Sequence, residues 1–251
     1  MVEAELTRKR LCELLKKSES APYFIFTDFL GLMELAIFHE IKKDFRGAVY
    51  TLFGGIDGAE RVMIRFGDPE ELGYEEPFPI VALKIEPLSE KFAENLTHRD
   101  YLGSILGLGI ERSVIGDIVI REKTAYIFIK EDMADYVSDS LTKVRRTDVR
   151  LSRVDELPSG ALYKTERRRL QAVGERVDAV IAKLFSLSRD DSLTLFKKGL
   201  VFADGKQITS ASYIPKSGEL ISVRGHGRFI YRGYESLTKK GKLNIEVDIY
   251  I

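Results

Sequence analysis

Apolar residues recur along the chain in two rhythms, one typical of helices and one typical of strands. In the first segment, apolar positions three and four apart predict helices around 11–15 and over "LMELAIFHEI" (32–41). The stretch "AVYTLFGGIDGAERVMIRF" (48–66) has the pattern of a strand, a glycine turn and a second strand. Residues 1–78 are therefore predicted to form an α+β domain of two helices and a β-hairpin.

The second segment, 79–157, alternates the two rhythms in a recognisable order. Strands are predicted at 79–85, 117–121, 124–130 and 148–154, and helices at 97–109 and 132–144. The order is β-α-β-β-α-β, which is the ferredoxin-like split motif shared by RRM domains.

The third strand of this segment, "TAYIFIK" (124–130), has two faces of different chemistry. Because side chains alternate along a strand, the two faces carry Ala125, Ile127 and Ile129 on one side and Tyr126, Phe128 and Lys130 on the other. Helices should cover the aliphatic face. The aromatic face is either a secondary RNA-binding surface on which bases stack or a surface that packs against a neighbouring domain. Packing is favoured, because the first strand adds no aromatic partner and the RRM consensus lacks its leading glycine here.

Charge is distributed unevenly along the chain. Its 251 residues carry 39 basic and 39 acidic side chains, a formal net charge of zero. Residues 164–251 hold 17 basic and 10 acidic side chains, a net charge of +7, and residues 1–163 hold 22 and 29, a net charge of −7. Such a basic part on a neutral chain indicates a polyanionic partner, unless the charges cluster by chance.

Other features exclude several classes of protein. The chain has no run of about 18 apolar residues, so we expect no transmembrane helix, and its first residues lack the apolar centre of a secretory signal. Cys12 is the only cysteine, which excludes an intrachain disulfide and a multi-cysteine zinc site. It is expected to pack on an amphipathic helix. We therefore expect a cytoplasmic protein with no cofactor, metal, membrane partner or small-molecule substrate.

The last part of the chain opens on a stretch that has the composition of a domain boundary. "ELPSGALYKTERRRLQAVG" (156–174) contains Pro158, Gly160 and three consecutive arginines, and we place a third domain at 164–251. A helix is predicted over "ERVDAVIAKLF" (175–185). Its inward-facing residues are expected to be Val177, Val180, Ile181 and Leu184.

A second short helix follows, with clear signals at both of its ends. Ser188 and Asp191 have the spacing of a capping box, so the helix should begin at Arg189. Gly199 stands where a C-terminal glycine is expected, after two lysines that suit the negative end of the helix dipole. The pair Asp-Gly at 204–205 then predicts a two-residue hairpin turn.

Two short helices, a glycine, a hairpin and "SGELISV" together resemble an S4 RNA-binding domain. The family pattern begins with Arg-Leu-Asp, at 176–178 here, and continues with Ser-Arg, at 188–189. It then has Gly-x-Val-x-Val-Asn-Gly, at 199–205, and Gly-Asp-x-Ile-x-Val, at 218–223. The departures from the pattern are Val177, Ser192, Ala203, Asp204 and Glu219. All preserve shape, although Asp204 adds a negative charge at the hairpin. The match to the S4 domain spans about 60 residues.

Further stretches are similar to the YlmH family of S4 proteins, over nearly the whole chain. They are "FGGIDGAERVMIRF" (53–66), "LTHRDYLGSILGLGIERSVIGDI" (96–118), "VRGHGRF" (223–229) and "TKKGKLNIEV" (238–247). The resemblance implies a non-catalytic RNA-binding protein that acts at the ribosome, on large subunits obstructed by peptidyl-tRNA. It implies ribosomal RNA and tRNA as partners and a link to cell division.

The predicted RNA contacts lie in the third domain. Free N–H groups at a helix N-terminus favour phosphate, and arginine binds phosphate bidentately. The residues expected to bind RNA are Arg176, Ser188, Arg189, Lys197, Lys198, Lys206, Arg224 and Arg228. The alternative is a solvated basic face without a ligand.

One alternative activity has residues of its own. His98, Arg99 and Asp100 resemble a fragment of a kinase catalytic loop, but Ile105 stands where that loop needs asparagine. Pseudouridine synthases fused to S4 domains also place a catalytic aspartate near His-Arg, so an RNA-modifying site around these residues is the alternative function. A weaker alternative is a protein-interaction module whose acidic first two-thirds form the docking surface.

Overall fold

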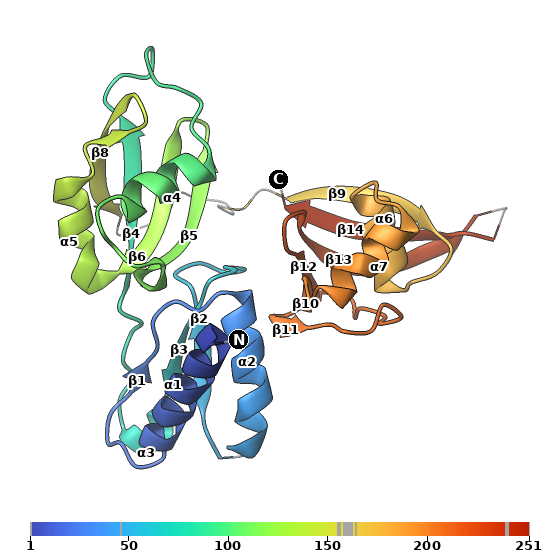
Figure 1. The fold of residues 1–251 in the computed structure, drawn as a ribbon, viewed down its shortest axis with the longest axis horizontal. Coiled ribbons are helices and arrows are strands. Elements are labelled where there is room, and N and C mark those ends of the chain that lie inside the picture. The colour runs from blue at the N-terminus through green and yellow to red at the C-terminus, as the bar shows by residue number, and fades with distance from the viewer. Residues whose placement is uncertain are drawn as a thin grey trace. The chain divides into compact units, whose positions relative to one another are not determined.

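The computed structural model of the chain divides into two compact units, Met1–Leu162 and Tyr163–Ile251 (Figure 1). It describes residues 2–45, 47–154, 157, 163, 165–238 and 241–250. Helices alternate with antiparallel sheets in both units, so the predicted α+β class is confirmed. The predicted boundary residues Pro158 and Gly160 lie outside the described residues.

The first unit opens with two helices and a small sheet. Helices α1 (Val2–Ser18) and α2 (Leu32–Ile41) pack on strands in the order β1 (Ile25–Phe26), β3 (Met63–Phe66), β2 (Tyr50–Phe53). Strands β2 and β3 form the predicted hairpin. The sequence pattern does not predict β1, because a two-residue strand has no alternation to recognise. Two short helices complete this part, η1 (Lys42–Asp44) and α3 (Pro69–Leu72).

The core of this part uses the predicted stripe of α1. Leu11 and Leu15 are fully buried against Phe38 of α2 and Phe66 of β3. Cys12 is half-buried and packs against the same core, as predicted. The helix therefore contributes packing, and its cysteine is an ordinary core-edge residue.

The rest of the first unit has the predicted element order with one strand added, because β7 forms at Lys143–Val144, where the helix was predicted to continue. Its elements are β4 (Ile80–Pro87), α4 (His98–Leu106), η2 (Arg112–Val114), β5 (Ile115–Arg121), β6 (Thr124–Lys130), α5 (Glu131–Ser140), β7 (Lys143–Val144) and β8 (Thr147–Val154). The antiparallel strands lie in the order β5-β6-β4-β8-β7. Helices α4 and α5 cover one face of this sheet, where Ala125, Ile127 and Ile129 are fully buried (Figure 1).

The aromatic face of β6 is not an exposed stacking platform. Tyr126 is 6% exposed and Phe128 is 1% exposed. A Cβ atom added to Gly55 would lie 2.4 Å from a ring carbon of Phe128, so the glycine turn of the first segment lies directly against this ring. This face therefore packs against a neighbouring segment, as favoured from the sequence. It is not a base-stacking surface, because both rings are buried.

The second unit is a sheet with two helices on one face. Its elements are β9 (Thr165–Ala172), α6 (Val177–Leu184), α7 (Arg189–Lys197), β10 (Val201–Ala203), β11 (Lys206–Gln207), β12 (Leu220–Val223), β13 (Gly227–Leu237) and β14 (Leu243–Tyr250). The strand order is β11-β10-β12-β13-β14-β9 (Figure 1). The four residues of α6 expected to face inward, Val177, Val180, Ile181 and Leu184, are all buried in the core of this unit.

The arginine run belongs to a strand and not to a boundary segment. Arg167, Arg168 and Arg169 lie on β9, which pairs with β14 over eight residues. Leu170 and Ala172 of the same strand pack on the core. The sequence pattern did not predict β9, because the segment is highly charged and shows no alternation of apolar residues. It forms a strand because it pairs with β14, about 80 residues further along the chain.

The predicted turn at 204–205 is confirmed. Asp204 has φ 44° and Gly205 has φ 74°, as a hairpin turn with two left-handed residues requires. Phe202 pairs with Gln207 and Ala203 with Lys206 on either side of the turn.

Gly205→Val should destabilise the second unit, because a β-branched residue at this φ is strained. We expect a loss of about 1 kcal/mol or more of unfolding free energy. Thermal denaturation of the full chain, followed by circular dichroism, measures it. Gly174→Val is a control, since a Cβ atom added there meets nothing within 4 Å and its φ is outside the left-handed range. Equal melting of both variants and the parent would contradict the turn assignment.

Candidate nucleic-acid interface

A groove runs along α6 in the second unit, with an apolar floor and a cationic rim. Its volume is about 530 Å³. The floor consists of small or apolar residues, Ala172, Val173, Gly174, Ala179, Ala182 and Leu187. The cations of the rim are Arg176, Lys183 and Arg189, and Asp178 and Ser186 complete the lining. Two residues predicted to bind RNA, Arg176 and Arg189, therefore line one groove, although 12 positions separate them in the sequence.

Arg176 is held in a fixed orientation at one end of this groove. Its Nε and Nη2 donate to the two carboxylate oxygens of Asp178 at 3.1 and 2.8 Å. The Asp178 side chain is 7% exposed and also accepts from the backbone N–H of Ala179 at 2.9 Å. The Arg176 side chain remains 46% exposed. A buried carboxylate thus orients an accessible guanidinium, and this pairing raises the pKa of Arg176.

Ser188 caps the helix that presents Arg189. The Ser188 hydroxyl accepts from the backbone N–H of Asp191 at 3.1 Å and donates to the Asp191 carboxylate at 2.6 Å. The predicted cap is confirmed, although the carboxylate returns to the hydroxyl and not to the backbone N–H. Because the cap occupies this hydroxyl, its role is to position the first residue of α7. Arg189 itself is exposed.

A second group of predicted cations lies around the other end of α7. Lys197 is the last residue of this helix and Lys198 is its C-cap. Two hydrogen bonds place Arg224 and Lys206 near this end of the helix. The backbone N–H of Arg224 donates to Leu200 O at 2.9 Å, and the side-chain amide of Gln207, which follows Lys206, donates to Gly199 O at 3.0 Å. Over the described part of this unit, no ion-pair partner is found for these four cations or for Lys183 and Arg189. All six charges are therefore available to an anionic ligand.

Arg228 does not belong to either group. Its neighbour Phe229 lies in the core beneath the helices, so Arg228 is on the opposite face of the sheet. There its guanidinium lies over the rings of Tyr163 and Tyr250, at 4.3 and 4.2 Å from their centroids. The structure thus does not bring Arg228 together with the other predicted contacts.

The same face of the sheet neutralises part of the basic charge. Arg167 bonds Asp248 at 2.8 Å, and Arg232 bonds the same carboxylate at 2.7 Å. Arg169 pairs with Glu235 at 2.6 Å. These pairs were not predicted, although Glu246 and Asp248 alternate in "NIEVDIY" and would have indicated an acidic strand face. Three arginines of the basic second unit are therefore paired with carboxylates on this face.

Comparisons with known proteins decide the family. A family model described as "Putative RNA-binding domain in YlmH" matches residues 74–157. The chain is 34% identical over 227 residues to "Ribosome-associated protein quality control protein P2" of Bacillus subtilis (strain 168), which covers 87% of this chain and 84% of that protein. The chain belongs to the YlmH family.

A solved structure extends the likeness to the fold. "Cell division protein ylmH from Streptococcus pneumoniae" superposes with a TM-score of 0.51 at 24% identity, over 61% of this chain and 92% of that one. The family-model match falls within the first unit and covers the sheet whose aromatic face is buried. In this YlmH-family chain, the groove on α6 thus lies in a different unit from the segment that the family model describes.

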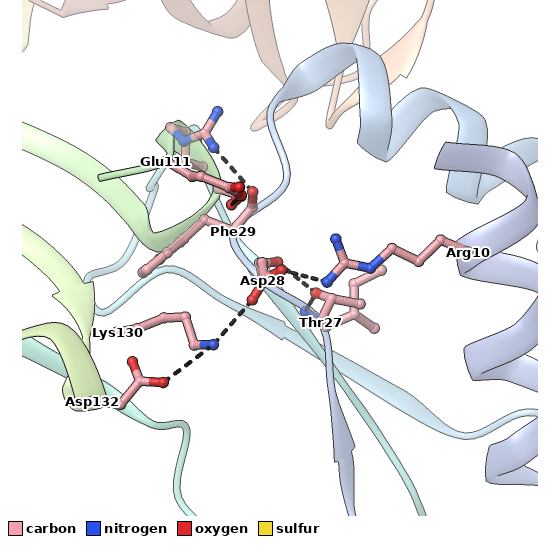
Figure 2. A network of polar contacts seen from close by, with 10 residues as sticks. Arg10, Thr27, Asp28, Phe29, Glu111, Lys130 and Asp132 are labelled. Atoms are coloured by element: carbon pink, nitrogen blue, oxygen red, sulfur yellow. Dashed lines mark hydrogen bonds and ion pairs between the residues drawn. The ribbon is translucent and has the colours of Figure 1, made fainter. Parts of the chain in front are cut away.

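Lys130, the remaining residue of the predicted secondary face, is part of a polar network in the first unit. Its Nζ lies 3.1 Å from the Asp28 carboxylate and 3.6 Å from that of Asp132, and Arg10 of α1 contacts Asp28 from the other side (Figure 2). Burial alone would raise the pKa of Asp28, but hydrogen bonds from Arg10 and Lys130 outweigh it and hold the pKa below its ordinary value. Lys130 is thus engaged in holding α1 and β6 together.

The residues of the alternative enzymatic site in this YlmH-family chain lie together at the start of α4. Asp100 accepts from the backbone N–H of Thr97 at 2.8 Å and from its hydroxyl at 2.7 Å, and pairs with Arg145 at 3.4 Å. The carboxylate is therefore a helix cap, and these bonds hold its pKa below the ordinary value. His98 and Arg99 are exposed at the same helix start. Among the residues the structure describes, no group of acidic, His or Cys side chains is arranged to hold a metal, and no helix has the length and apolarity to span a membrane.

Proposed function

We propose that this chain is a non-catalytic RNA-binding protein whose second unit is an S4 domain. The observation that carries the proposal is the convergence of Arg176, Lys183 and Arg189 on one groove. Two of these residues stand at positions of the S4 pattern, and the third has no ion-pair partner in the described part of the unit. Phosphate groups of structured RNA supply the missing negative charge.

The arrangement of α7 supports phosphate binding at both of its ends. At its start, the N-terminus of a helix favours an anion, and the exposed side chain of Arg189 lies at its first position. At its other end, Lys197, Lys198 and Arg224 extend the cationic surface across the adjoining strands. RNA therefore contacts the helical side of the unit and leaves the Arg228 face uncovered.

The ribosome is the proposed place of action. The Bacillus subtilis relative is named a ribosome-associated quality control protein, and we extend that association to this chain. The proposed target is the large ribosomal subunit obstructed by peptidyl-tRNA, with ribosomal RNA and tRNA as ligands, in the cytoplasm. A link to cell division rests on the name of the Streptococcus pneumoniae protein alone.

The second unit should bind structured RNA without the first. It has its own core of helices α6 and α7 on the sheet, so residues 163–251 should fold alone. With about five phosphate contacts, the slope of log affinity against log salt should be roughly −3 to −5. Filter binding of the fragment to a ribosomal RNA stem-loop at several salt concentrations measures it. A folded fragment without RNA affinity at low salt, or with a salt-independent affinity, would sink the proposal.

Sedimentation of a cell extract tests the place of action. The full chain should travel with large subunits through a sucrose gradient and leave them at high salt. Lys197→Glu/Lys198→Glu, which reverses two cations of the proposed surface, should shift the chain to the top of the gradient. A parent chain that remains at the top at low salt would contradict association with the ribosome.

A further inference from the structure

We propose that the groove along α6 binds an unpaired nucleotide that projects from the RNA helix. The inference rests on the proposed function and adds the class of ligand that the groove takes. A surface that only follows a phosphate backbone needs exposed cations and no cavity. Here the cations surround a groove of about 530 Å³, which is within the usual range for small-molecule sites.

The floor of the groove fits the flat, weakly polar face of a base. Ala179 and Ala182 lie three positions apart on α6 and therefore on one side of the helix. Their short side chains leave room between the helix and the segment that follows β9, where Val173 is 84% exposed. An exposed valine beside two alanines is a poor surface for a phosphate and a suitable one for a nucleobase.

Arg176 supplies a stacking surface at the edge of this floor. Unpaired bases in protein–RNA complexes stack on aromatic rings or on guanidinium planes. The bidentate bond to Asp178 fixes the plane of the Arg176 guanidinium before any ligand binds. Its side chain is still 46% exposed, so a face of the plane remains open. A lysine at this position would preserve the charge and lose the plane.

Lys183 and Arg189 supply the charge for the phosphates that flank the base. Both line the groove, and neither has an ion-pair partner within the described stretch 165–238. A base on the alanine floor, a guanidinium on its face and two cations on its phosphates give each cation of the rim a role, and Asp178 holds the guanidinium. An acidic peptide would use the same cations, but its carboxylates would leave the apolar floor of the groove uncovered.

Two RNA hairpins with the same stem separate this inference from general RNA binding. One hairpin carries a single bulged 2-aminopurine, and the other has the same nucleotide paired. The full parent chain should bind both hairpins at low salt and prefer the bulged one by about 5- to 100-fold, the range expected for stacking one base. The emission of the bulged 2-aminopurine should change on binding.

Two variants remove the preference in different ways. Arg176→Lys keeps the charge and removes the plane, and Ala182→Leu fills the floor without changing charge. Both should bind the two hairpins equally. Arg224→Lys is the matched control outside the groove and should keep the preference. Circular dichroism confirms that each variant is folded.

The possible outcomes distinguish the two proposals. A parent chain that binds neither hairpin overturns the RNA-binding function and the inference with it. A parent chain that binds both equally overturns the inference alone, as does a preference that persists in folded Ala182→Leu. An acidic peptide is added as a competitor. A peptide that displaces neither hairpin supports a nucleotide site. A parent chain that binds both hairpins equally and also binds the peptide in the groove overturns it.

Discussion

Arg189→Glu should weaken the binding of this chain to large ribosomal subunits by about 10- to 100-fold at low salt, because a bidentate donor is replaced by a like charge. Folding should survive. Arg189 is exposed at the first position of α7, where the helix dipole tolerates a carboxylate and Asp190 and Asp191 already stand. The measurement is a titration with isolated large subunits, with circular dichroism as the check on folding.

The first helix provides matched controls for this charge reversal. Lys9→Glu and Lys17→Glu make the same change on α1, which belongs to the acidic part of the chain. They should alter affinity far less than Arg189→Glu. If a folded Arg189→Glu protein binds as well as the parent, the RNA-binding surface lies elsewhere. The cations around the other end of α7 would then be the next candidates, since the Tyr126 and Phe128 rings are buried.

Arg61→Ala should unfold or strongly destabilise the first unit, with an expected loss of about 3 kcal/mol or more. The Arg61 side chain donates to three backbone carbonyls, those of Ile115 at 2.8 Å, Phe29 at 3.0 Å and Arg112 at 3.1 Å. Removing the guanidinium leaves the carbonyls of Phe29 and Arg112 without this donor, whereas Ile115 O still accepts from Arg112 Nη1 at 2.5 Å. Each unsatisfied buried group costs about 1–3 kcal/mol. Burial of the side chain lowers its pKa, in keeping with its position inside the unit.

Chemical denaturation of the full chain measures this loss of unfolding free energy. Arg61→Lys should be nearly as destabilising, because an ammonium group cannot reach three separated carbonyls. Arg99→Ala is the control, since it removes an exposed arginine of the same unit and should change the free energy of unfolding by less than about 0.5 kcal/mol. An Arg61→Ala protein with the parent's denaturation midpoint would show that other contacts hold β5 to the first hairpin.

The sequence predicted those parts of the candidate site that depend on local signals. The Ser188 cap, the glycine at 199 and the turn at 204–205 each follow from backbone requirements within a few residues. The inward face of α6 follows from a period of 3.6 residues in the same way. The order of strands and helices in 79–157 could also be derived, because long stretches of clear alternation specify element type.

The accessibility of a face could not be derived from the strand that carries it. Tyr126 and Phe128 alternate with buried aliphatic residues as the residues of a stacking platform would. The ring of Phe128 is covered by Gly55, which lies more than 70 positions away in the sequence. Alternation specifies two faces, and only the packing of another segment decides which of them meets solvent.

The sequence by itself determined the α+β class, the helix ends of the candidate site and the presence of a basic C-terminal part. The tertiary structure decided which of those charges lie together. Arg167 and Arg169 pair with carboxylates of distant strands on the sheet, whereas Arg176 and Arg189 converge on one groove. The physical reason is that caps and turns arise from neighbours along the chain, whereas charge pairing depends on distance in space, which is set only when β14 pairs with β9 and α6 packs on the sheet.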